Sequence, residues 1–64
     1  MGKSVKARIK SELNELNGKI VKLDEFIKKA DFKKLNKENQ KLLKEQKNVM
    51  EKYADILIKR IELN

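Results

Sequence analysis

The chain contains no cysteine, no histidine, no proline and no tryptophan, and each absence excludes a kind of structure or chemistry. Without cysteine there is no disulfide, and without cysteine or histidine we expect no zinc site and no nucleophile and base pair of the usual hydrolytic kind. The two serines, Ser4 and Ser11, have no partner residues around them. We therefore expect no enzymatic activity, no bound metal and no cofactor.

Long apolar runs are also missing. No segment approaches the roughly 18 apolar residues that a membrane-spanning helix needs. The basic start of the chain is not followed by the apolar segment of a signal peptide. These absences predict a cytoplasmic protein with no membrane partner.

What the sequence does contain is apolar residues at helical spacing, in both halves of the chain. In the first half, alternating steps of four and three join Ile9, Leu13, Leu16, Ile20, Leu23 and Ile27. In the second half, a broader row comprises Leu42, Leu43, Val49, Met50, Ala54, Leu57 and Ile61. This period is typical of α-helices that bury one side. It predicts an all-α fold, an antiparallel two-helix hairpin.

The expected organisation is a single domain over residues 1–64, with helix one at about 4–30, a turn at 31–36 and helix two at about 37–62. Ser4 and Asn36 are residue types that cap helix starts well. Asp31 is expected to cap a short turn in which Phe32 and Leu35 plug the closed end of the hairpin. With no proline and only two glycines, nothing forbids two long helices.

A lone hairpin of this size leaves apolar surface uncovered. Each helix can shield only one side of its neighbour's apolar row. In addition, the single core of a chain below about 70–80 residues rarely supplies more than about 3–5 kcal/mol of stability, so such chains usually need a disulfide, a metal or a partner chain as well. No disulfide or metal can act as a staple here. The sequence therefore predicts self-association, as a dimer or tetramer that forms a helical bundle.

The charge of the chain is +7, from 17 lysines and arginines against 10 acidic residues. The excess gathers at the two ends of the predicted hairpin, at Lys3, Lys6, Arg8, Lys10, Lys59 and Arg60 and around the turn at Lys28, Lys29, Lys33, Lys34, Lys37 and Lys41. A symmetric oligomer would concentrate these charges into patches that attract anions. The alternative is an ordinary lysine-rich solvated surface. Nucleic acid is a possible anionic partner, but the usual recognition signatures are missing.

Three polar residues of helix two, Gln46, Tyr53 and Arg60, follow one another at intervals of seven. Polar residues beside an apolar row commonly set register or oligomer state. Their chemistry also suits a nucleotide, because an amide can read a base, a ring can stack on it and a guanidinium can bind phosphate. Antiparallel pairing is expected to bring Asn14 and Asn17 near Tyr53. The candidate ligand-binding residues are Gln46, Tyr53, Arg60, Asn14, Asn17 and Arg8.

The chain resembles a family of small proteins encoded by tailed phages and prophages, named after a relative from a crAss-like phage. The resemblance rests on Phe32, Leu35, Asn36, Gln40, Leu42, Leu43, Gln46, Met50, Tyr53, Ile56, Leu57 and Arg60, with Val5–Lys10 and Leu16–Phe26 matching the first helix. Where many relatives have serine as the second cap, this chain has Asn36.

The resemblance implies phage origin and residence in the cytoplasm of an infected or lysogenic bacterial host. Phage proteins of this size often antagonise host defence, and several small helical oligomers among them sequester cyclic nucleotide immune signals. The expected function is therefore counter-defence, by an oligomeric bundle that binds and sequesters an anionic cyclic nucleotide without catalysis. The alternatives are a protein-interaction module that docks its apolar row on a host or phage protein, and nonspecific nucleic-acid binding.

Overall fold

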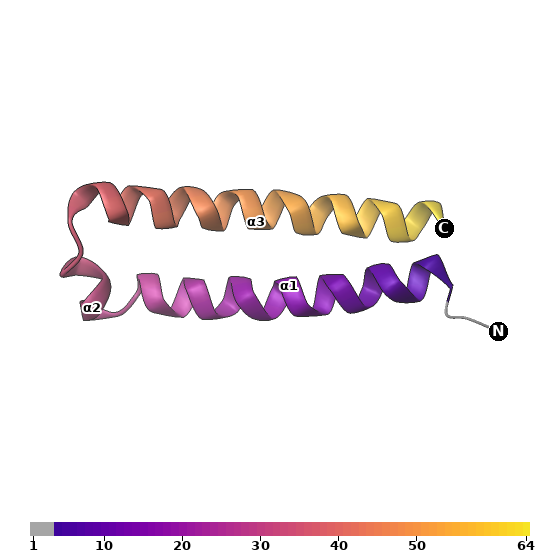
Figure 1. The fold of residues 1–64 in the computed structure, drawn as a ribbon, viewed down its shortest axis with the longest axis horizontal. Coiled ribbons are helices and arrows are strands. Elements are labelled where there is room, and N and C mark those ends of the chain that lie inside the picture. Colours follow the sequence, from indigo (N-terminus) through magenta and orange to yellow (C-terminus); the bar gives the residue numbers. More distant parts are fainter. Residues whose placement is uncertain (1–3) are drawn as a thin grey trace.

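The computed structural model describes residues 4–64, and Lys3 of the predicted basic cluster lies outside them. Two long helices, α1 (Val5–Ile27) and α3 (Lys37–Leu63), run antiparallel and are joined through the one-turn helix α2 (Ala30–Lys33) (Figure 1). The hairpin is a rod with extents of 50 × 16 × 13 Å. We call the end that carries α2 the closed end and the opposite end the open end. The predicted all-α antiparallel hairpin is confirmed.

Both long helices begin at side-chain caps. The Ala7 N–H donates to Ser4 Oγ at 3.2 Å, and the Asn39 N–H donates to Asn36 Oδ1 at 2.8 Å. Each bond satisfies one of the amide groups that a helix start leaves without a partner. The capping roles predicted for Ser4 and Asn36 are confirmed.

The first helix ends at Ile27 rather than near residue 30, and the reason lies in the backbone of Lys29. This residue adopts an extended conformation (ψ 157°) and becomes the N-cap of α2. The sequence had placed Asp31 in that role. Asp31 instead lies in the first turn of α2, where a carboxylate interacts favourably with the helix dipole.

Phe32 closes the hairpin, as predicted. Its side chain is only 4% exposed. The ring packs edge-on against Phe26, with centroids 6.2 Å apart and planes at 89°, and the Lys44 ammonium lies 5.8 Å from its centroid. Leu35 is half-buried beside it. This small aromatic cluster joins α1, α2 and α3 at the closed end.

The apolar core lies between α1 and α3, and α1 contributes the row that its sequence predicts. Ile9 and Leu16 are buried, and the other four members of that row are half-buried. From α3, Ala54 and Leu57 complete the buried cluster. The α3 residues that face α1 form what we call the inner row: Leu43, Lys47, Met50, Ala54, Leu57 and Ile61.

Two residues that the sequence assigned to the buried row of α3 face solvent instead. Leu42 is 53% exposed and Val49 is 64% exposed. Each stands one residue before a member of the inner row, which turns its side chain by about 100° around the helix. The broad apolar stripe of α3 is therefore two rows, and only one of them packs on α1.

Gly18, in the middle of α1, offers a direct test of helix propensity. A Cβ atom placed on it would meet no atom within 4 Å. We expect Gly18→Ala to stabilise the hairpin by about 0.5–1 kcal/mol, which corresponds to a rise of a few degrees in Tm. Thermal unfolding followed by circular dichroism measures the change. Lys19→Ala at the neighbouring exposed position is the control, with little change expected; a lower Tm for Gly18→Ala would show that another molecule covers this site.

Candidate functional site

The candidate residues Gln46, Tyr53 and Arg60 belong to a row on one flank of α3, about 100° around the helix from the inner row. We call this row the outer row; it comprises Leu42, Gln46, Val49, Tyr53, Ile56, Arg60 and Leu63. Every member is exposed. Apolar and polar members alternate along it at steps of four and three, the same spacing that the inner row uses to pack on α1.

The three polar members stand about 10.5 Å apart along the helix, two turns from one to the next. The Gln46 amide donates weakly to the Met50 sulfur at 4.0 Å. Tyr53, in the middle, is 40% exposed. Arg60 takes part in none of the ion pairs formed among residues 4–64. An aromatic face and a guanidinium are thus both presented to solvent on one side of the hairpin, with no pocket around them in this part of the chain.

Asn14 and Asn17 do not lie beside Tyr53, contrary to the sequence prediction. On α1, Asn17 lies about 80° around the helix from the middle of the buried row, toward the side that carries Asp24. On α3, Tyr53 lies about 80° around the helix from the middle of the inner row, on the side away from Lys47. Asp24 and Lys47 contact each other and so mark one flank of the hairpin. Asn17 is therefore on the opposite flank from Tyr53, and Asn14, about 60° further around α1 in the same direction, faces away from α3.

Arg8 is exposed and lies on the Tyr53 side of α1, at the open end near Arg60. The same helical geometry places it about 100° from the buried row of α1, away from Asp24. Of the six candidate residues, the structure therefore gathers four on one flank: Gln46, Tyr53, Arg60 and Arg8.

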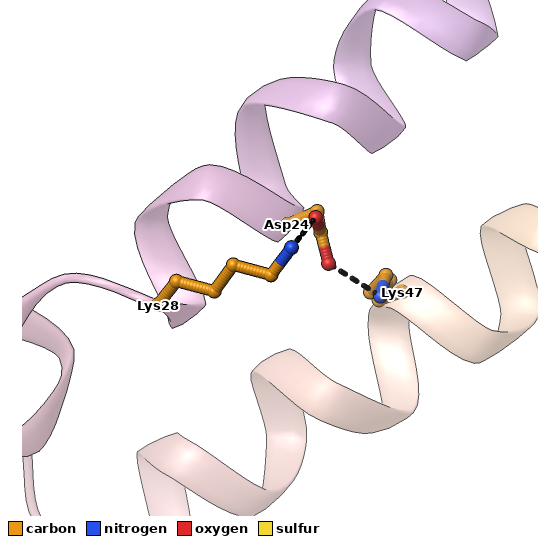
Figure 2. Close-up of polar contacts among 3 residues, drawn as sticks. All are labelled: Asp24, Lys28 and Lys47. Carbon is orange, nitrogen blue, oxygen red and sulfur yellow. Dashed lines mark hydrogen bonds and ion pairs between the residues drawn. The ribbon is translucent and has the colours of Figure 1, made fainter.

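A polar contact joins the two long helices near the closed end, and the sequence did not predict it. Lys47 occupies a position of the inner row, and its Nζ donates to Asp24 Oδ1 at 2.7 Å; Lys28 Nζ lies 2.9 Å from Asp24 Oδ2 (Figure 2). Both side chains of the interhelical pair are about 30% or less exposed. The Lys47 hydrogen bond, and then that of Lys28, lowers the pKa of Asp24 to about 2, and the hydrogen bond to Asp24 raises the pKa of Lys47. No simple sequence signal singles out this pair, because Asp24 stands seven residues before the predicted turn at 31–36 and Lys47 stands eleven residues after it.

The lowered pKa of Asp24 makes the hairpin sensitive to acid. Because the folded pKa lies below the ordinary value of 3.8, Asp24 stabilises the fold above about pH 4, and this contribution disappears as the pH falls toward 2. We expect the urea midpoint of the native chain to fall over that range. Asp24→Asn should lose this part of the pH dependence, whereas Asp55→Asn, which removes an exposed carboxylate, should retain it. Parallel curves for all three proteins would contradict the assignment.

The basic residues gather at both ends of the folded hairpin. Around the closed end stand Lys28, Lys29, Lys33, Lys34, Lys37 and Lys41, and at the open end Lys6, Arg8, Lys10, Lys59 and Arg60. Within residues 4–64, acidic partners engage Lys28, Lys34 and Lys47. The uncompensated charge produces a positive potential that attracts anions to either end. No helix of the described part is long and apolar enough to cross a membrane.

Comparison with known protein families gives a match that spans nearly the whole chain. The model of the Sequestin family matches residues 3–63. No curated protein and no solved structure is detectably similar to the chain. The match covers both long helices, the turn between them and the entire outer row. The chain therefore belongs to the Sequestin family.

Proposed function

We propose that this protein binds an anionic cyclic nucleotide immune signal and withholds it from its receptor, without catalysis, as a phage counter-defence protein. The family name denotes sequestration, which is retention of a molecule without conversion. The observation that carries the proposal is the exposed line of Gln46, Tyr53 and Arg60 in a chain of this family. Phage origin rests on the resemblance described above.

The chemistry of the line suits a nucleotide. A tyrosine ring at the centre offers a stacking surface for a base, and such stacking is worth about 1–3 kcal/mol. The Arg60 guanidinium is able to bind phosphate through two parallel hydrogen bonds. The Gln46 amide carries both donor and acceptor atoms for a base edge. The net charge of +7 adds a general attraction for an anion.

A second candidate function, docking on another protein, draws on the apolar half of the same row. Leu42, Val49, Ile56 and Leu63 are all more than half exposed. An apolar row of this kind is typical of surfaces that meet a partner. Calorimetric titration with cyclic dinucleotides, cyclic trinucleotides and ADP-ribose derivatives separates the two functions. Binding to a member of this panel supports sequestration; no binding even at millimolar concentration would contradict it and favour docking.

Arg60→Ala tests the phosphate-binding role directly. Loss of a charge-assisted hydrogen-bonded pair costs about 1.5–3 kcal/mol, so we expect affinity for the bound nucleotide to fall at least tenfold. Lys10→Ala is the matched control, because it removes the same charge at the same end of the hairpin but on the opposite flank. Titration calorimetry measures both. Equal losses in the two variants would mean that only the overall charge matters.

A further inference from the structure

We propose that the outer row of α3 docks on the outer row of α3 in a second copy of this chain, with the two helices antiparallel about a two-fold axis near Lys52. The row runs from Leu42 to Leu63, a length of about 32 Å. It has the heptad spacing by which α1 and α3 already pack within one chain. The chain thus carries two helix-pairing rows on α3 and fills only one of them itself.

The apolar surface of the described residues is concentrated on this row. Their exposed large apolar side chains are Val5, Val21, Leu42, Val49, Tyr53, Ile56, Ile58 and Leu63. Five of these eight belong to the outer row, and the other three are scattered over α1 and the opposite flank of α3. A continuous exposed row of this kind marks an interaction surface rather than ordinary scatter.

The order of residues along the row identifies a second copy as the occupant. Read from either end, the row runs apolar, polar, apolar, tyrosine, apolar, polar, apolar, ending in Leu42 and Leu63. A two-fold interface requires a surface that complements itself when turned end to end. This row meets that requirement, because Val49 and Ile56 lie at equal distances from its middle, as do Leu42 and Leu63.

The charges beside the row favour the antiparallel orientation. Four charged residues follow one another at intervals of seven, about two helical turns, along the solvent side of the row. The first two are acidic and the last two are basic: Glu38, Glu45, Lys52 and Lys59. Antiparallel docking about Lys52 brings Glu45 of one copy beside Lys59 of the other. Parallel docking would bring each of these residues beside its own copy, which is unfavourable, whereas antiparallel docking does so only for Lys52 at the axis.

This arrangement has a consequence for the ligand site, which rests on the function proposed above. Gln46 and Arg60 lie at equal distances on either side of Tyr53. In the antiparallel pair, Gln46 of one copy therefore lies beside Arg60 of the second copy, and the two Tyr53 rings meet near the axis. The amide and the guanidinium that would hold one nucleotide then come from different chains, so the site is incomplete in a single copy.

Sedimentation equilibrium without ligand tests the interface. We expect the native chain to dimerise, and Val49→Lys to raise the dimer dissociation constant at least tenfold. Val21→Lys is the matched control, because Val21 is also a valine on a long helix and is 54% exposed, but on the opposite flank. It should change the constant less than twofold. A monomeric native chain at about 100 μM, or equal effects of the two substitutions, would overturn the proposal; Ile56→Lys replaces Val49→Lys should the latter lose helicity.

Spin labels test the orientation, and the absence of native cysteine allows single labels to be placed cleanly. Labels on Glu38→Cys should lie about 42 Å apart in the antiparallel pair, whereas labels on Lys52→Cys should lie close together. Parallel docking would give short distances at both positions and would overturn the proposal. Both measurements are made without nucleotide. A correct dimer that binds no member of the nucleotide panel would refute the proposed function and leave the interface standing.

Discussion

Leu57→Ala is expected to leave most of the chain unfolded at 25 °C. Leu57 is fully buried and lies at the centre of the cluster formed with Ile9, Leu16 and Ala54. Truncating a buried leucine to alanine costs about 2–5 kcal/mol. A core of this size supplies only about 3–5 kcal/mol in total, so the loss consumes most of the stability. Urea unfolding followed by circular dichroism gives the value.

Leu42→Ala is the control for this prediction, since it makes the same change on the same helix at a side chain that is half exposed. We expect this substitution to lower the free energy of unfolding of the monomeric hairpin by well under about 1 kcal/mol. Association stabilises by mass action, so any larger loss that disappears on dilution would come from the contact between copies. Equal costs for Leu57→Ala and Leu42→Ala at every concentration would contradict the assignment of the inner row.

Phe32→Ala is expected to destabilise the hairpin nearly as much, by about 3 kcal/mol or more. The ring is almost fully buried, packs edge-on against Phe26 and lies under the Lys44 ammonium. Its removal opens a cavity where all three helices meet. Thermal unfolding measures the effect, and Phe32→Leu, which keeps most of the apolar volume, should recover much of the loss. An unchanged Tm for Phe32→Ala would show that the turn contributes little to the fold.

The sequence predicts α1 more accurately than α3, and the reason is the distribution of apolar residues. In α1 the buried row is separated by polar residues over most of its length, so the period alone identifies it. In α3 apolar residues come in adjacent pairs, as at Leu42 and Leu43 or Val49 and Met50. One member of each pair belongs to either row. Periodicity cannot decide which member faces α1, because that depends on how the partner helix is turned.

Lys47 made the assignment harder, because a charged residue fills an inner-row position where an apolar one is expected. Its partner Asp24 stands on the other helix, 23 residues away in the chain. Only the register of the hairpin brings them together. The turn shows the same limit: capping preference favours Asp31, yet the extended backbone falls on Lys29. The residue types indicate which residues are able to cap a helix or form an ion pair, and the backbone conformation determines which of them do so.

The candidate site was predicted in part. The line of Gln46, Tyr53 and Arg60 follows from spacing alone, since residues seven apart share a face of any helix. Placing Asn14 and Asn17 beside that line needed the relative rotation of two helices. The position of a residue along the hairpin axis does not determine on which side of the hairpin its side chain lies. The two asparagines are therefore at the level of Tyr53 along the axis but not on its side of the hairpin.

The two ends of the hairpin resist separation by different physical means. At the closed end, the short connection keeps α1 and α3 at high effective concentration, because little chain entropy is lost when they meet. The open end has no such tether, and helix ends fray most readily where packing is sparse. Yet Ile9 and Leu57, the two least exposed core residues, lie toward that end. Amide exchange should therefore be slowed along the whole rod instead of accelerating steadily away from the turn, and the open end should hold Arg60 at a steady position.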